Sequence, residues 1–291
     1  LAGSNLIDCH HNVAIGTEAL KASTLVDYTV IIGSQTGDAA MTADADGTVA
    51  VGYSALGALT SGIGNVALGF QALNAISDGT NNIAIGYQAL LSADESESNN
   101  VAIGFSSMSA MNHDNCSRNV GIGSYTLDGV ASGEQVADCV AIGHLALSGA
   151  AQSSNGADEA SGTVAIGSSA LTSLTSGAGN TAVGYQAGNF ATTGGNNTFL
   201  GYQAGYGLDG TPLTGNDNTA IGKDAGKLLQ GAAHSNTSLG SLAGDVITTG
   251  QLNTCVGKGS DTGSATAQNQ QVFGYATIGV GDNSVTLGAD S

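Results

Sequence analysis

The 291-residue sequence has few of the residues that fill a conventional protein core. It contains no tryptophan, five phenylalanines and one proline, against 46 glycines. A globular domain of this length normally builds one large core in which aromatic side chains contribute much of the buried area. The sequence therefore favours a thin, repetitive core, in which stability is a sum of contacts between neighbouring repeats.

Positive charge is also scarce. Five Lys and Arg stand against 23 Asp and Glu, which gives a formal net charge of −18 at pH 7. Nucleic-acid binding depends on clustered basic residues, so we expect no nucleic-acid partner. No stretch approaches the roughly 20 apolar residues of a membrane-spanning helix, so we expect no membrane insertion. Since Leu1 is neither a methionine nor the start of a signal peptide, we expect a removed leader or a longer parent chain.

Motifs for catalysis and metal binding are missing as well. The four cysteines have no Cys-x-x-Cys spacing, and the scattered His and Ser residues form no nucleophile motif. We therefore predict no catalytic residue, no cofactor and no metal, and a chain that is not an enzyme. Two alternatives stay open: Ca²⁺ bridging carboxylates of acidic loops such as 92–97 and 157–159, and a disulfide between Cys116 and Cys139 of successive repeats, which would suit an extracellular setting.

What the sequence has in abundance is one repeated unit. The nine residues 82–90, Asn-Ile-Ala-Ile-Gly-Tyr-Gln-Ala-Leu, recur with small changes along the chain, and their glycine recurs sixteen times, most often 17 residues apart, as in Gly69 and Gly86. A helix-pair repeat needs roughly 33 to 47 residues, so each unit must be one turn of a β-structure. We predict an all-β fold, a parallel β-solenoid (β-roll or β-helix) of about 16 coils.

Each repeat places a small residue between two aliphatic ones. Alternate residues of a strand point to opposite faces. We expect the aliphatic residues, here Val66, Ile83 and Ile85, to form ladders inside the solenoid. The small residues, Ala67 and Ala84, would then line the outer face and leave room for a neighbouring copy of the chain. This interpretation makes the protein an oligomer; the alternative is that alanine fits the tight turn of a monomeric coil.

Two further columns accompany the strands. Asparagines begin most repeats, and stacked amides can hydrogen-bond to their copies above and below; among them are Asn65, Asn82, Asn180 and Asn197. Tyr or Phe often follows the glycine, and we expect these rings to stack. Their interpretation is structural, with binding of sugar rings as the alternative.

The repeat changes type along the chain. Residues 1–179 use Val-Ala-Ile-Gly followed by Ala-Leu, whereas residues 180–291 use Asn-Thr-x-x-Gly-Tyr-Gln-Ala-Gly. We interpret these as two sections of one continuous solenoid. Glycines such as Gly188 replace the leucine, which predicts a slimmer second section or a changed contact with partner chains. The longest insertions, 148–162 and 206–216, are candidate recognition loops because insertions in solenoids gather on one face.

These residues carry a family resemblance. The stretches 65–69, 82–86 and 284–288 resemble the head repeats of trimeric autotransporter adhesins, and 180–188 resembles repeats of bacteriophage tail-fibre and bacterial surface fibre proteins. The resemblance covers essentially the whole chain. It implies a left-handed parallel β-roll, three chains packed side by side as a homotrimer, and a role in surface attachment.

The sequence leads to one main functional hypothesis and one alternative. We expect a structural, non-enzymatic subunit of an extracellular fibre or filament, at a cell surface or on a virion. It would associate with copies of itself, as a homotrimer or head to tail, because the strands near both ends lack polar caps. The alternative is an adhesin head that binds a receptor or surface glycans.

Overall fold

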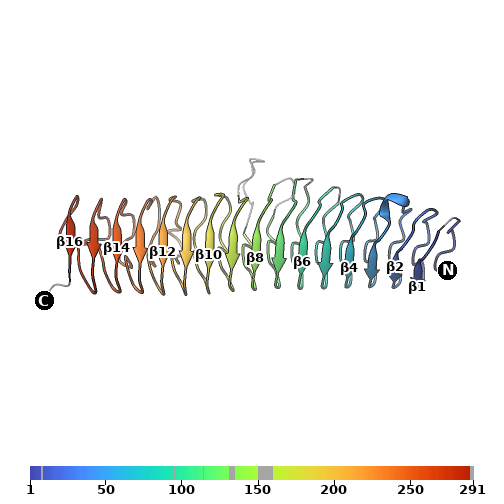
Figure 1. The fold of residues 1–291 in the computed structure, drawn as a ribbon, viewed down its shortest axis with the longest axis horizontal. Helices are drawn as coiled ribbons and strands as arrows, with labels where there is room; N and C mark the ends of the chain where they lie inside the picture. The colour runs from blue at the N-terminus through green and yellow to red at the C-terminus, as the bar shows by residue number, and fades with distance from the viewer. Residues whose placement is uncertain (8, 95, 114, 131–134, 150–159, 289–291) are drawn as a thin grey trace. The chain divides into compact units, whose positions relative to one another are not determined.

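The computed structural model describes residues 1–7, 9–94, 96–113, 115–130, 135–149 and 160–288. As predicted, the chain is an all-β parallel solenoid of sixteen strands, one to a coil, each three residues long and most often 17 residues after the last (Figure 1). A short 3-10 helix, η1 (Ala43–Ala45), lies between β2 and β3. None of the helices in these ranges is long and apolar enough to span a membrane.

The chain divides into two compact units. The first comprises residues 1–141 and 151–158, and the second 142–150 and 159–291. The strands of the first are β1 (Val13–Ile15), β2 (Val30–Ile32), β3 (Val49–Val51), β4 (Val66–Leu68), β5 (Ile83–Ile85), β6 (Val101–Ile103) and β7 (Val120–Ile122). Each pairs in parallel with the next, without a register shift, so that Val66 lies beside Ile83.

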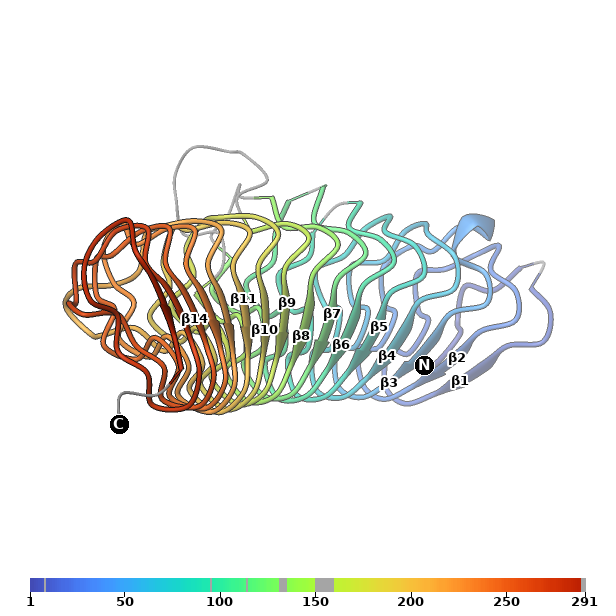
Figure 2. The ribbon, with the colours of Figure 1, turned by 60° about the vertical axis from the view of Figure 1, so that its left-hand side comes forward.

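Strand β8 (Val140–Ile142) spans the division between the units in the sequence. The second unit continues with β9 (Val164–Ile166), β10 (Thr181–Val183), β11 (Thr198–Leu200), β12 (Thr219–Ile221), β13 (Thr237–Leu239), β14 (Thr254–Val256), β15 (Gln271–Phe273) and β16 (Val285–Leu287). The change of repeat type at residue 180 lies within this unit, where β9 and β10 pair in register. In Figure 2 each coil runs from its strand through a loop that returns to the next strand.

The two faces of each strand are the reverse of the sequence prediction. The middle residues, such as Ala67 and Ala84, are fully buried inside the coil of a single chain. The aliphatic residues on either side, including Val66, Ile83 and Ile85, point outward and are only partly buried. The predicted aliphatic ladders inside the solenoid and the predicted alanine stripe on its outer face were therefore both wrong.

The small interior explains this reversal. In most coils of the first unit the fourth residue after the glycine is a large side chain that is fully buried, as at Leu73 and Leu90. It approaches the strand from across the coil: a Cβ added at Gly121, in the middle of β7, would lie only 2.8 Å from Met108 Cε. Because these side chains already occupy the interior, the middle strand position has room for little more than a methyl group.

Phe199 shows that the interior can hold a large strand residue where the turn residues are small. It is a fully buried middle residue in β11, at a position where most other strands have alanine. The turns around it carry Gly188 and Gly205 in place of leucine, and a Cβ at Gly188 would lie 2.6 Å from Phe199 Cδ2, while one at Gly205 would clash with Phe199 Cδ1. The volume lost in the turns is filled from the strand, so replacement of leucine by glycine does not by itself make this part of the section slimmer.

Buried asparagines join successive coils ahead of the strands. Asn82 donates its backbone N–H to Asn65 Oδ1 (3.0 Å), and its own Oδ1 accepts the backbone N–H of Asn100 (3.0 Å). Its Nδ2 donates to Asn65 Oδ1 and to the Glu97 carbonyl (2.7 Å). In the second unit the same bonds link Asn180, Asn197, Asn218, Asn236 and Asn253. Every polar atom of such an amide is thereby used inside the coil.

The glycine after each strand is required for two separate reasons. Gly86 has φ +137°, which L side chains rarely adopt. In addition, a Cβ at this position would clash with the backbone carbonyl of Gly104 in the next coil. Gly69 is placed in the same way against Gly86. The glycine column therefore sets how closely the coils stack.

We predict that Gly86→Ala destabilises the protein by on the order of 3 kcal/mol, because it adds a clash between coils to an unfavourable dihedral angle. Gly47→Ala is the matched control: Gly47 has φ +72° but open space around its Cα, so we expect a cost of about 1 kcal/mol. Denaturant midpoints would compare the two variants, and equal costs would contradict the role assigned to coil stacking.

We predict that Asn82→Leu costs roughly 3 kcal/mol or more, because it removes the hydrogen bonds that the amide makes to two buried backbone groups, the Asn100 N–H and the Glu97 carbonyl. Asn82→Thr is expected to cost less, since Thr29 occupies the same column and donates its hydroxyl to Asn12 Oδ1 (2.8 Å). Urea unfolding followed by circular dichroism would measure both. A leucine variant as stable as the threonine variant would show that the amide column contributes little.

Candidate interaction surface

The outward side chains of the first unit form an uncharged, largely apolar surface, which we call the outer strand face. It consists of the first and third residues of β1 to β7 and the residue after each glycine. Side chains exposed by more than a third include Val13, Ile15, Tyr53, Leu68, Phe70, Tyr87, Phe105 and Ile122. No Asp, Glu, Lys or Arg occupies any of these positions. The sequence prediction had placed the aliphatic part of this surface in the interior.

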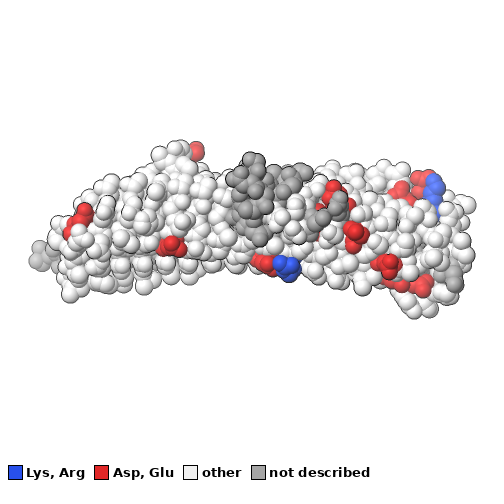
Figure 3. All heavy atoms as spheres, turned by 90° about the horizontal axis from the view of Figure 1, so that it is seen from above, with Lys and Arg blue, Asp and Glu red and all other residues white. Residues whose placement is uncertain are grey.

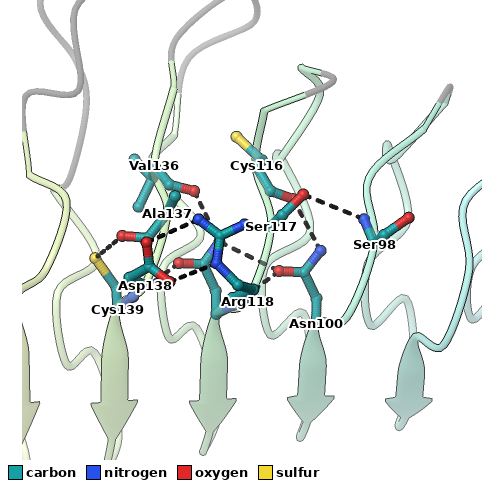
Figure 4. Close-up of polar contacts among 10 residues, drawn as sticks. Ser98, Asn100, Cys116, Ser117, Arg118, Val136, Ala137, Asp138 and Cys139 are labelled. Atoms are coloured by element: carbon teal, nitrogen blue, oxygen red, sulfur yellow. Dashed lines mark hydrogen bonds and ion pairs between the residues drawn. The ribbon is translucent and has the colours of Figure 1, made fainter.

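Charged groups lie elsewhere on the molecule. In the view of Figure 3 they form small separate groups, mostly acidic, on an otherwise uncharged surface. Arg118 and Asp138, in adjacent coils, form an ion pair with Nε–Oδ1 2.6 Å and Nη2–Oδ2 2.8 Å (Figure 4). The guanidinium lowers the pKa of the Asp138 carboxyl. Both side chains are exposed, so we expect this pair to add little stability.

The aromatic residues of the outer strand face form a continuous stack. Ring centroids are 5.3 Å apart for Tyr53 and Phe70, and 5.1 Å apart for Phe70 and Tyr87 and for Tyr87 and Phe105, with nearly parallel planes. Inside this stack each ring covers the faces of its neighbours, so only ring edges are open to solvent. Sugars bind aromatic residues through the ring face, which makes this row a poor glycan site along most of its length.

A glutamine column runs beside the rings in both units. Gln88 Nε2 donates to Gln71 Oε1 (3.0 Å), and Gln203 Nε2 donates to Gln186 Oε1 (2.8 Å). Because these glutamine side chains are hydrogen-bonded from one coil to the next, they repeat along the border of the face with the same spacing as the backbone.

Cys116 and Cys139 do not form a disulfide in the structure; both are buried as thiols, which corrects the pairing considered from the sequence. They belong to different columns of the coil. Cys139 takes the place of an asparagine, and its backbone N–H donates to Asn119 Oδ1 (3.0 Å). Cys116 lies three residues before Asn119, in the column of Val136, so the two sulfur atoms are not stacked (Figure 4).

Two carboxyls of the second unit interact in adjacent turns. Burial, and after it a hydrogen bond with Asp245, raise the pKa of Asp261 to about 8. The Val246 N–H donates to Asp261 Oδ1 (3.3 Å). The same region raises the pKa of the Cys255 thiol to about 12, first through burial and then through Asp261. With a pKa of about 8, the Asp261 carboxyl is mostly protonated near neutral pH.

The predicted recognition loops and acidic loops are only partly described. Residues 150–159 lie outside the described residues, and so does Glu95, so most of the first insertion and much of the acidic runs considered for Ca²⁺ cannot be placed. In the second insertion, buried Leu213 forms parallel bridges with Ala191 and Gly231. Within the described ranges no three His, Cys, Asp or Glu residues gather in a way that could hold a metal ion.

Comparison with known proteins adds no family to this description. No protein-family model matches the sequence, and no curated protein matches it. What is established is the fold, a parallel β-solenoid built from repeats.

We predict that the unfolding free energy falls between about pH 4 and pH 8 because of Asp261. Its folded pKa, about 8, is above the unfolded value of about 3.9, so its stabilising contribution is complete at low pH and is lost as pH rises through the folded pKa. Asp261→Asn does not lose this contribution as the pH rises. The difference in unfolding free energy between the variant and the wild type should therefore shift in favour of the variant from pH 5 to pH 8, as measured by denaturant midpoints. The exposed Asp209→Asn is the control, and an identical pH response of the two variants would refute the prediction.

Proposed function

We propose that the protein is a structural, non-enzymatic subunit of an extracellular fibre or filament and associates with copies of itself through the outer strand face of the first unit. The observation that carries this proposal is the uncharged column of outward aliphatic residues, such as Leu68 and Ile85, bordered by the aromatic stack. It replaces the alanine stripe as the expected contact between chains.

The size of the apolar surface supports a covered state. The largest apolar patch on a typical monomer is roughly 300–600 Å², and larger ones mark interaction sites. Here two aliphatic columns run over seven strands, and four consecutive repeats add an exposed ring beside them. Leaving such a face in water forfeits about 25 cal/mol for each Å² that a partner could bury.

Periodicity favours a second copy as the partner. The face repeats in register from coil to coil, so a surface with the same repeat can match it at every coil, whereas an unrelated globular surface would match it at few. Charge agrees, because a chain with net charge −18 keeps its acidic groups off this face. Self-repulsion is therefore weakest where we place the contact, and interfaces between identical chains are typically apolar.

The setting and the role follow from the same features together with the resemblance of the repeats. Adhesin heads and phage tail fibres, which these repeats resemble, act outside cells, and a homotrimer is the assembly that this resemblance implies. We therefore place the protein at a cell surface or on a virion. The mutual covering of ring faces from Tyr53 to Phe105 favours a structural role for the aromatic row over glycan binding.

We predict that Leu68→Asp prevents self-association, because a carboxylate buried in an apolar contact costs several kcal/mol at each site where it occurs. Leu25→Asp is the matched control: Leu25 and Leu68 are similarly exposed, at 52% and 46%, but Leu25 lies outside the outer strand face. Size-exclusion chromatography with light scattering would give the molar mass, and circular dichroism would check the fold. A monomeric wild type, or equal behaviour of the two variants, would exclude the proposed interface.

A further inference from the structure

The outer surface of the second unit differs from that of the first. In β10 to β14 the first outward residue is always threonine and the third is Val, Leu or Ile. The threonines lie beside one another in register, as Thr198 lies beside Thr181 and Thr219. We call these ten side chains the threonine face: Thr181, Thr198, Thr219, Thr237 and Thr254 with Val183, Leu200, Ile221, Leu239 and Val256.

The hydroxyls of the threonine face are not used by the fold. None of its five threonines makes a side-chain hydrogen bond to the described part of the chain. Threonines of another column in the same unit behave differently: the hydroxyls of Thr175 and Thr192 donate to the carbonyls of Thr192 and Leu213, at 3.2 and 3.3 Å. The strand threonines are only partly buried and keep both donor and acceptor capacity for a ligand outside the molecule.

The strand geometry orders these groups in two directions. Neighbouring strands of a parallel sheet are about 4.8 Å apart, and residues i and i+2 of one strand are about 6.6 Å apart. Threonine and valine are stiff at χ1, so their methyl and hydroxyl groups are held in place. The result is a rectangular array in which a row of hydroxyls alternates with a row of hydrocarbon.

We propose that the threonine face binds ice. A ligand that satisfies every hydroxyl of this array must itself be periodic, must offer donors and acceptors at each repeat, and must tolerate hydrocarbon between them. It is also uncharged, because none of the ten side chains carries a charge in a molecule of net charge −18. The oxygen lattice of ice has these properties, and it repeats over distances comparable with the spacings of the array.

A protein ligand fits the array less well. A dry contact would leave each hydroxyl without a partner wherever the opposing surface presents hydrocarbon, and each such hydroxyl would lose the hydrogen bonds that it makes to water. Water molecules in an ice lattice can hydrogen-bond to every hydroxyl and also tolerate the hydrocarbon between the hydroxyls. This face belongs to the second unit, and so the inference does not rest on self-association through the first.

The test uses the purified full chain and ice itself. We expect the protein to partition into a slowly growing ice crystal and to slow ice recrystallisation, while a protein without an ordered face stays in the liquid. The double variant Thr219→Lys with Thr237→Lys, which places long charged side chains across the array, should return both readouts to the buffer baseline. Thr193→Lys with Thr249→Lys is the control, since both residues are exposed outside the threonine face, and it should behave as wild type.

The outcomes separate this inference from the proposed assembly. A wild-type chain that remains in the liquid, or lysine and control variants that act alike on ice, would overturn it. Light scattering on the same samples reports the oligomeric state. If the double variant Thr219→Lys with Thr237→Lys changes only the molar mass and the wild type has no effect on ice, the threonine face is a contact between chains and the proposal is wrong.

Discussion

The close stacking of one coil on the next is the constraint on which the rest of the structure depends. At the glycine column the backbones approach so closely that a side chain at Gly86 would clash with the Gly104 carbonyl. The buried asparagines maintain the same repeat on the other side of the strand, with N–H to Oδ1 distances of 3.0 Å from Asn65 through Asn82 to Asn100. These contacts tie successive coils of each unit into a regular stack, and side chains can only occupy what space is left.

The narrow interior then decides the chemistry of the surface. Leu73 and Leu90 fill the inside of their coils, so alanine is the usual residue on the inner side of the strand. The larger β-branched residues must point outward, although they are the most apolar residues of the repeat. A single chain therefore buries its polar asparagines and exposes its valines and isoleucines. This inversion produces both the apolar outer strand face of the first unit and the threonine face of the second.

The sequence predicted the fold well, because a 17-residue period with Val-Ala-Ile strands is compatible with few structures. It did not predict which strand face lies inside, since alternation groups residues on a face without saying where that face points. One signal was present in some coils: the middle strand residue and the turn residue differ in size in opposite directions where Gly121 lies near Met108 and where Phe199 lies near Gly188 and Gly205. Such compensation indicates one shared interior. The position of Cys116 and Cys139 in different columns could also be counted from the repeat, whereas the pairing of Asp245 with Asp261 depends on turn geometry that the repeat does not encode.

The central claim is that the outward aliphatic residues of the first unit are covered by copies of the same chain. A high-resolution electron microscopy map of the purified, assembled protein tests it most directly. We expect Leu68 and Ile85 to pack against the corresponding side chains of neighbouring copies, while Ala67 and Ala84 stay enclosed within their own coils. A map in which the outer strand face is bathed in solvent, or in which the copies touch only through other surfaces, would contradict it.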